Sequence, residues 1–218
     1  MKHEKAFTYE YAQPVEYAFC QDSVLAPLAI ANDLENHDSR EQLSSWRVLD
    51  VCAGCGVMGF ELHHALPELR TIDFLEIQAA FESSFRKNVK AVLSSGGSLD
   101  RTFTWIEQPY SALQSPPLAW QYDLVVCNPP YFDLGEGTLP QNPVKQRARF
   151  FLDDTLESLL MSLRSALKPE GRAYVLMKSG KKHGRDAFTL AQSLLSDCDI
   201  EKLADVRGTD LVRITKRA

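Results

Sequence analysis

The sequence lacks any hydrophobic run long enough to cross a membrane, and its first five residues are too polar to begin a secretion signal. It has five cysteines, an odd number, and we expect them to be reduced in a cytoplasmic protein. Cys52 and Cys55 have Cys-x-x-Cys spacing, but the sequence offers no second pair and no histidine pair to complete a zinc site. We therefore expect neither a membrane partner nor a metal ion.

The 218 residues also lack internal repeats, low-complexity tracts and any segment typical of a linker. A chain of this length can bury a large core as one unit. We predict an N-terminal arm over residues 1–21, where aromatic and polar residues alternate, followed by a single domain over residues 22–218. The arm is expected to be an extended segment or an edge strand that could also act as a lid.

Positive charge is not in excess, since Lys and Arg number 24 against 29 Asp and Glu, which gives a net charge of -5. This balance argues against a protein that coats nucleic acid through charge alone. The charge is uneven: residues 1–130 carry 9 basic and 17 acidic side chains, and residues 131–218 carry 15 and 12. The second part of the chain could therefore contact phosphate locally.

Apolar, β-branched runs alternate with segments of helical periodicity along most of the chain. The expected strands cover residues 46–51, 71–75, 102–106, 122–127, 172–177, 200–206 and 211–215, the last two as a hairpin across residues 207–210. The expected helices cover residues 24–31, 57–66, 78–93, 151–167 and 185–195, with loops over 32–45 and 128–148. This alternation predicts an α/β fold with a seven-stranded, mostly parallel sheet, helices on both faces and only the last strand antiparallel.

The residues Asn128-Pro129-Pro130-Tyr131 directly follow the expected strand 122–127. Two prolines cannot extend a strand, so the chain must turn at the carboxyl end of the strand, where open parallel sheets bind ligands. The Asn128 side-chain oxygen and a backbone carbonyl could accept both hydrogens of a planar NH2 group, and Tyr131 offers a face on which a flat ring could stack. A tight turn without a function is the alternative for these four residues considered by themselves.

A glycine turn, Asp50-Val-Cys-Ala-Gly-Cys-Gly56, follows the first expected strand and opens a helix. Such a turn leaves helix N–H groups free and lets a ligand approach the backbone closely. With Gly59 it also matches the Gly-x-Gly-x-x-Gly pattern of nicotinamide dinucleotide binding, with Glu76 placed to bind ribose hydroxyls. A pyrophosphate beside the Asp50 carboxylate would be repelled, however, whereas an ammonium group would be attracted.

S-adenosylmethionine, with its amino acid end, sulfonium and ribose, suits this pattern better than a dinucleotide does. Asp50 would attract its ammonium group, and Glu76 would accept hydrogen bonds from its ribose hydroxyls. Ile77 could pack on the adenine ring, and Gln108 could meet the adenine amino group. The predicted cofactor-binding residues are Asp50, Ala53, Gly54, Gly56, Glu76, Ile77 and Gln108.

Taken together, Asp-x-x-x-Gly-x-Gly, an acidic end to the second strand and Asn-Pro-Pro-Tyr after the fourth resemble a class I S-adenosylmethionine-dependent methyltransferase that modifies amino groups. The resemblance runs from about Asp22 to the C-terminus and implies a Rossmann-like methyltransferase fold. Within this class the chain is similar to the small bacterial tRNA adenine-N6 methyltransferases. The similar stretches are Asn128-Pro-Pro-Tyr-Phe132, Arg147-Ala-Arg149 and Gln21-Asp-Ser-Val-Leu25.

The chain departs from the commoner pattern of these enzymes at several positions. It has Cys52-Ala53 and Cys55 in the glycine turn, Gln108 where many relatives carry Asp, and an insert of its own over residues 133–146. These departures concern the substrate more than the cofactor.

The resemblance implies methyl transfer to the N6 amino group of an adenine in tRNA or another structured RNA. Asn128, Pro129, Pro130 and Tyr131 are the predicted catalytic residues, and Phe132, Lys145, Arg147 and Arg149 are predicted to bind the RNA. A second basic run contains Lys178, Lys181, Lys182 and Arg185. Solvated loops are the alternative for both basic runs and core packing is the alternative for Phe132. We expect a monomer.

Other acceptors remain open at this point. A protein glutamine amide presents the same NH2 group to the turn, although relatives that modify release factors carry an N-terminal helical domain, and about twenty residues precede Gln21 here. DNA adenine is another option, but no target-recognition domain is evident. A non-catalytic scaffold that binds the cofactor is disfavoured by the intact Asp50, Glu76 and Asn-Pro-Pro-Tyr motif.

Overall fold

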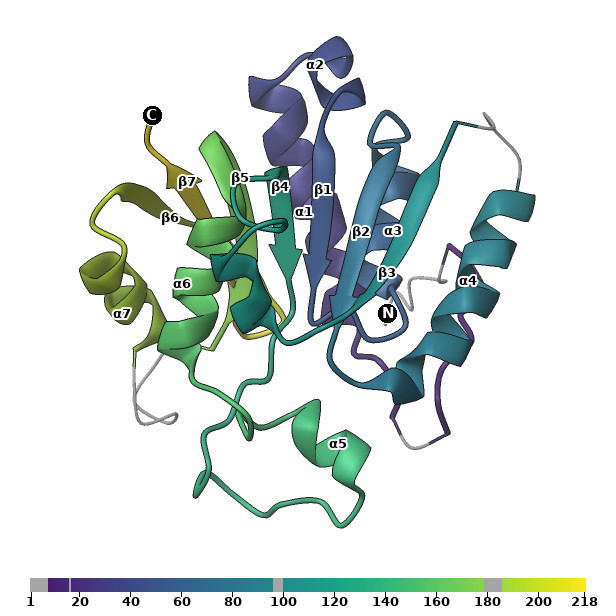
Figure 1. The fold of residues 1–218 in the computed structure, drawn as a ribbon, viewed down its shortest axis with the longest axis vertical. Coiled ribbons are helices and arrows are strands. Elements are labelled where there is room, and N and C mark those ends of the chain that lie inside the picture. Colours follow the sequence, from purple (N-terminus) through teal and green to yellow (C-terminus); the bar gives the residue numbers. More distant parts are fainter. Residues whose placement is uncertain (1–7, 16, 96–99, 179–185) are drawn as a thin grey trace, which may run out of the picture.

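The strands pair into one seven-stranded sheet in the order β3-β2-β1-β4-β5-β7-β6 (Figure 1). The computed structural model describes residues 8–15, 17–95, 100–178 and 186–218. Strands β1 to β5 are parallel, and β7 is antiparallel to its neighbours β5 and β6, which confirms the predicted fold. The strands are β1 Arg47–Val51, β2 Thr71–Glu76, β3 Thr102–Glu107, β4 Tyr122–Cys127, β5 Leu167–Met177, β6 Cys198–Val206 and β7 Thr209–Lys216.

Helices cover both faces of the sheet. The α-helices are α1 Asp22–His37, α2 Arg40–Ser44, α3 Val57–Ala65, α4 Glu82–Ser94, α5 Pro143–Arg147, α6 Leu156–Ala166 and α7 Ala187–Leu194, and two 3-10 helices are η1 Ala79–Phe81 and η2 Tyr110–Gln114. Helices α1, α3 and α4 pack on one face, and η2, α6 and α7 pack on the other (Figure 1). In the described part of the chain, no helix has the length and hydropathy needed to cross a membrane.

Strand β4 shows how the two faces share the core. Leu124 and Val126 pack with α1 and α3, whereas Val125 and Cys127 pack with α6 and α7, and all four side chains are fully buried. Side chains alternate between the two faces along a strand, and here both faces are covered by helices. A central parallel strand therefore appears in the sequence as a continuous apolar run rather than as an alternating one.

Helices α1 and α2 occupy much of the segment that we expected to be a loop over residues 32–45, so that prediction is wrong. Leu34 and Leu43 are fully buried there, and each fixes its helix against the core. Ser39 begins α2 with a capping box, in which its hydroxyl accepts a hydrogen bond from the Gln42 N–H and the Gln42 side chain accepts one from the Ser39 N–H. One buried leucine in each segment was too weak a periodic signal to show in the sequence.

Helix α6 begins at Leu156 rather than at residue 151, because Thr155 caps it by accepting a hydrogen bond from the Ser158 N–H at 3.2 Å. The expected loop 128–148 contains α5. Residues 168–171, between the expected helix 151–167 and the expected strand 172–177, form a bulge inside β5, where the pairing of Tyr122 with Leu167 gives way to that of Leu124 with Arg172. The last predicted helix is confirmed over Ala187–Leu194, and its expected first residue, Arg185, lies outside the described residues.

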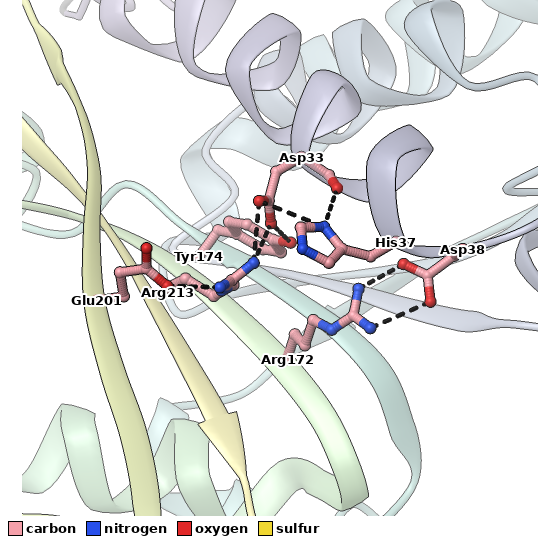
Figure 2. A network of polar contacts seen from close by, with 7 residues as sticks. All are labelled: Asp33, His37, Asp38, Arg172, Tyr174, Glu201 and Arg213. Carbon is pink, nitrogen blue, oxygen red and sulfur yellow. Dashed lines mark hydrogen bonds and ion pairs between the residues drawn. The ribbon is translucent and has the colours of Figure 1, made fainter.

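Asp33 on α1 joins this helix to the last strands of the sheet (Figure 2). Its carboxylate accepts a hydrogen bond from the Tyr174 hydroxyl of β5 at 2.6 Å and forms an ion pair with Arg213 of β7 at 2.8 Å. Arg213 also pairs with Glu201 of β6 at 2.5 Å. Burial and the Asp33 carboxylate raise the pKa of Tyr174, so its hydroxyl stays a donor throughout the physiological range.

A second ion pair lies one turn further along, between Asp38 and Arg172 of β5 (Figure 2). The Asp38 side chain is only 6 % exposed, and the pair has two N–H···O contacts, which is the strong geometry for arginine and carboxylate. His37 closes the helix by placing its Nδ1 2.7 Å from the Asp33 carbonyl oxygen. The end of α1 is therefore held against β5, β6 and β7 by directed polar contacts rather than by apolar packing alone.

We expect Asp33→Ala to lower the free energy of unfolding by about 2 kcal/mol, because the Tyr174 hydroxyl loses its acceptor and Arg213 keeps only the exposed Glu201. Denaturant unfolding followed by circular dichroism measures the change. The matched control is Asp199→Ala on β6, since the 74 % exposed Asp199 side chain pairs with Arg217 in solvent and its loss should cost less than about 0.5 kcal/mol. Equal losses in the two variants would contradict this account.

Candidate active site

The carboxyl ends of β1, β2, β3 and β4 meet at one edge of the sheet, and two adjoining cavities lie there. The large cavity, of about 830 Å³ including space open to solvent, is lined by residues that follow β2, β3 and β4, by residues 147 and 148 and by residues 150–154. The small cavity, of about 440 Å³ including open space, lies over the turn that follows β1. Tyr17, Cys52, Gly54, Phe81 and Asn128 line both cavities, so the two form one continuous site.

Asp50 lies in β1, next to its end, and lines the small cavity. Its side chain is buried, and its Oδ2 accepts a hydrogen bond from the Gly59 N–H at 2.9 Å. Burial raises the pKa of the Asp50 carboxyl to about 7, although the Gly59 N–H opposes this by stabilising the anion. Gly59 is required for this approach, because a Cβ there would lie 2.5 Å from the Phe74 ring and 3.1 Å from the Asp50 Oδ2.

The glycine turn after β1 uses its two glycines differently. Gly54 has a φ of +54° and lines both cavities, and its N–H donates a hydrogen bond to Glu76 Oε2 at 2.9 Å. Gly56, at the start of α3, has a φ of +86° and lines neither cavity. A Cβ there would lie 2.6 Å from the Phe60 ring. Ala53 lines the small cavity only. Among these three predicted residues, Gly56 therefore has a packing role in the structure.

Glu76 ends β2 and lines the large cavity. Its Oε2 accepts from the Gly54 N–H and its Oε1 from the Gln78 N–H, both at 2.9 Å. Burial raises the pKa of the Glu76 carboxyl, and these N–H groups oppose the rise. Ile77, which is 40 % exposed, and Gln108, which follows β3, also line the large cavity, so with Gly54 the structure brings four of the predicted cofactor-binding residues together there.

Asn128 lies at the turn after β4 and its carboxamide is held at both ends. Its Nδ2 donates hydrogen bonds to Ser23 Oγ at 2.8 Å and to Cys20 Sγ at 3.3 Å, and its Oδ1 accepts one from the Tyr131 hydroxyl. Pro130 lines the large cavity. Among the described residues, none donates a hydrogen bond to the Pro129 carbonyl oxygen.

Tyr131 lies outside both cavities and is half-buried. Its N–H donates to the Arg149 carbonyl at 3.1 Å, which fixes the turn against the segment that follows α5. Lys178, after β5, places its ammonium nitrogen 5.3 Å from the centre of the Tyr131 ring, within the range of a cation–π contact. Burial raises the pKa of Tyr131, so the hydroxyl remains protonated and donates to Asn128.

The four residues predicted to bind nucleic acid differ in their surroundings. Phe132 contacts Phe150 at 5.4 Å between ring centres, and the Arg149 guanidinium lies 5.5 Å from the Phe132 ring. Arg147 lines the large cavity and forms an ion pair with Asp153 at 2.5 Å, which compensates its charge. Lys145 and Arg149 are exposed. Of the second basic run, the structure describes Lys178, whereas Lys181, Lys182 and Arg185 lie outside the described residues.

Sequence reasoning did not name the aromatic residues that enclose the site. Tyr17 of the N-terminal arm lines both cavities and meets Phe81 of η1 edge to face at 5.9 Å. Burial raises the pKa of Tyr17 to about 12. The arm is fixed in this place by Asn88 of α4, whose side chain exchanges two hydrogen bonds with the Ala12 backbone. The aromatic content of the arm was the available signal, but only its possible role as a lid followed from it.

Within the described ranges, no group of three or more His, Cys, Asp or Glu side chains is placed to hold a metal ion. The carboxyls of Asp50 and Glu76 and the carboxamide oxygen of Asn128 are hydrogen-bond acceptors in residues that line the cavities. Such acceptors suit a ligand with N–H and O–H groups.

Comparison with known proteins agrees with this geometry. The family model described as methyltransferase small domain matches residues 29–193. The tRNA1(Val) (adenine(37)-N6)-methyltransferase of Musicola paradisiaca is 30% identical over 148 residues, which are 68% of this chain and 56% of that protein. The enzyme of the same name from Proteus mirabilis is 28% identical over 130 residues, which are 60% of this chain and 48% of that protein. The chain therefore spans about half the length of these curated relatives.

Solved structures agree on the fold. Precorrin-6y C5,15-methyltransferase from Geobacter metallireducens superposes with a TM-score of 0.58 at 17% identity, over 96% of this chain and 95% of that chain. A TehB-like S-adenosylmethionine-dependent methyltransferase from Corynebacterium glutamicum superposes with a TM-score of 0.53 at 16% identity, over 88% of each chain. These structures share the fold of this chain, and the chain belongs to the methyltransferase small domain family.

Proposed function

We propose that this methyltransferase modifies the N6 amino group of an adenine in tRNA or another structured RNA. The observation that carries the proposal is the Asn128 carboxamide at the junction of the two cavities, held so that its oxygen end faces the Tyr131 hydroxyl and its NH2 end faces α1. The names of the curated relatives support adenine in tRNA as the acceptor.

The residues of the two cavities fit S-adenosylmethionine. Among the described residues, Asp50 and Glu76 form no ion pair, and their hydrogen bonds come from the backbone N–H groups of Gly54, Gly59 and Gln78. Two buried carboxyls that form no ion pair suit a cationic, hydroxyl-bearing ligand. Asp50 would hold the ammonium group and Glu76 the ribose hydroxyls, with Ile77 and Gln108 at the adenine. When bound, the cofactor supplies a methyl group made electrophilic by the sulfonium.

The acceptor amino group would be oriented by two oxygens. Its two hydrogens point to the Asn128 Oδ1 and the Pro129 carbonyl, which draws the nitrogen lone pair out of conjugation with the ring. A carboxamide oxygen has two lone pairs, so the Tyr131 hydroxyl can keep its hydrogen bond while the substrate adds a second. The chain contributes orientation and electrostatic stabilisation, and the nitrogen loses its proton late, without a dedicated base.

The target base would be turned out of its helix to reach the site, as nucleobase-modifying enzymes require. Tyr131 is the proposed stacking partner, and stacking of a base on an aromatic ring is worth about 1–3 kcal/mol. Lys145 and Arg149 would contact phosphate, because both are exposed near the turn, whereas Arg147 is already paired with Asp153. Lys178, beside Tyr131, extends this positive surface.

The test is transfer of a labelled methyl group from S-adenosylmethionine to total tRNA, ribosomal RNA and protein extract, each from cells that lack the gene. Label in RNA that digests to N6-methyladenosine is the expected result. Label confined to protein, at glutamine, would overturn the proposal, and so would label found only in DNA added as a fourth substrate.

Asn128→Ala is expected to lower the turnover rate by about 10²–10³-fold, since one preorganised hydrogen-bonding group at the reacting nitrogen is lost. The affinity for S-adenosylmethionine, measured by isothermal titration calorimetry, should stay within about twofold of that of the wild type. The control is Asn32→Ala on the exposed side of α1, which should change neither quantity. Loss of cofactor affinity along with turnover would contradict separate roles for Asn128 and the carboxyls.

Cofactor affinity is expected to fall as the pH falls below about 7. The pKa of Asp50 in the free protein is about 7, an ammonium group binds the ionised form, and each pH unit below the pKa should therefore weaken binding up to about tenfold. Calorimetry at pH 6, 7 and 8 measures this slope, and Asp50→Asn should flatten it. A slope unchanged in the variant would assign the titration to another group, such as Glu76.

The Asp50→Asn variant also has a predicted effect on stability. Its sign is opposite to the effect of removing an ordinary ion-paired carboxyl. Because the folded state raises the Asp50 pKa from 3.8 to about 7, it binds the proton more tightly than the unfolded state, and stability falls as the pH rises through that window. Asp50→Asn should therefore not lower the Tm at pH 8. A lower Tm would show that the carboxylate stabilises the fold.

Charge reversal at Lys145 and Arg149 tests the RNA surface. The double variant Lys145→Glu, Arg149→Glu should weaken tRNA binding at least about tenfold at low salt and reduce the slope of log K against log salt by about 2. The matched control is Lys87→Glu, Lys90→Glu on the exposed face of α4, and it should change neither the slope nor the affinity for S-adenosylmethionine. Equal losses in the two double variants would mean that RNA responds to net charge and not to this surface.

A further inference from the structure

Ser23 connects α1 to the turn that carries Asn128. It lies in the first turn of the helix and is 8% exposed, and its Oγ lies 2.8 Å from the Asn128 Nδ2. The two residues are 105 positions apart in the chain. Cys20, immediately before the helix, adds a second and weaker acceptor at 3.3 Å from the same nitrogen.

The Ser23 hydroxyl has no capping role that would explain its position. Helix α1 has Gln21 as its N-cap residue, and no side chain there forms a cap hydrogen bond. The distance from Ser23 Oγ to Cys20 Sγ is 3.9 Å, which is long even for sulfur. The short contact of the hydroxyl is therefore the one to Asn128.

The hydroxyl distinguishes the two ends of the Asn128 side chain. A carboxamide has an oxygen end that accepts and a nitrogen end that donates, and rotation about its terminal torsion by about 180° exchanges them. Only the oxygen end can accept a hydrogen bond from a substrate amino group. With Ser23 and Cys20 at the NH2 end and the Tyr131 hydroxyl at the oxygen end, the carboxamide is held in the one orientation that serves an amino acceptor.

Helix α1 gives this contact a rigid support. Beside Ser23, the side chains of Val24 and Ala26 are buried in the core. At the other end of the helix, the ion pairs of Asp33 and Asp38 hold it to β5 and β7 (Figure 2). A hydroxyl on an element fixed at both ends can hold a partner to the accuracy that catalysis needs, which a loop residue would not do.

We infer that Ser23 is a positioning residue that fixes the Asn128 carboxamide with its oxygen toward the acceptor amino group. This inference rests on the proposed function of Asn128. Ser23 also lines the small cavity, but in this role it acts through Asn128.

The kinetic test compares Ser23→Ala with Ser23→Thr in labelled methyl transfer to tRNA. The alanine variant should lose about tenfold in kcat, because one orienting hydrogen bond is removed, while its Kd for S-adenosylmethionine and its Tm stay near those of the wild type. The threonine variant keeps the hydroxyl and should recover most of the kcat. The control is Ser84→Ala on α4, which should retain full kcat. Ser84 is 8% exposed, like Ser23, and is remote from Asn128 in the chain.

A second measurement does not depend on the acceptor. In protein labelled with ¹⁵N at asparagine, the Asn128 side-chain NH2 signal is identified by its loss in Asn128→Ala. The chemical shift of this signal should change in Ser23→Ala, and its hydrogens should exchange with water faster. The same is expected in Ser23→Cys, whose thiol is similar in size to the hydroxyl but is a weak acceptor. An unchanged NH2 signal in both variants, or an unchanged kcat in Ser23→Ala, would overturn the inference. If the wild type modifies no RNA, the proposed function fails, and the NMR result still decides whether Ser23 orients Asn128.

Discussion

The parallel pairing of β1 with β4 places the Asp50 carboxyl and the turn at Asn128 at one edge of the sheet. In this pairing Asp50 stands opposite Val126 and Val51 opposite Cys127, so the carboxyl in β1 and the turn after β4 reach the same edge of the sheet. The strand order also reverses at this pair, because β2 and β3 extend the sheet to one side and β5, β7 and β6 extend it to the other. The helix after β1 covers one face and the helix after β4 the other, which leaves a crevice between the two turns. In the proposed function, Asp50 of β1 and Asn128 after β4 would bring the cofactor and the acceptor amino group together there.

The buried carboxyls of the site lower the stability of the fold. Asp50 and Glu76 are both buried, and burial raises the pKa of each carboxyl because a charge far from water is costly. Asp197, away from the site, has the opposite arrangement, because its ion pair with Arg164 lowers the pKa of its carboxyl. This contrast marks Asp50 and Glu76 as candidates for ligand binding.

The sequence predicted the sheet well because strands and turns can be recognised from residues that are neighbours in the chain. A buried parallel strand such as β4 is a continuous apolar run, and a turn such as Asn128-Pro-Pro-Tyr131 begins where the run ends, so neither needs a partner far away in the chain to be recognised. The full extent of α1 was not predictable in this way. Its polar second half is held by Tyr174, Arg172 and Arg213, from which it is separated by more than 130 residues. The same limit applies to the site, where Ser23 contacts Asn128 across 105 positions of the chain.

The contact between Asp33 and Arg213 joins residues 180 positions apart. At a synthesis rate of about 5–20 residues per second, β7 leaves the ribosome about 10–40 s after α1 does. During that interval α1 lacks its ion pair with β7, although it can already pack on α3 and β4. Contacts of such high sequence separation slow folding, because closing a long loop costs chain entropy. Helix α1, which contacts Asn128 through Ser23, therefore gains its full set of polar contacts only after the final hairpin has joined the sheet.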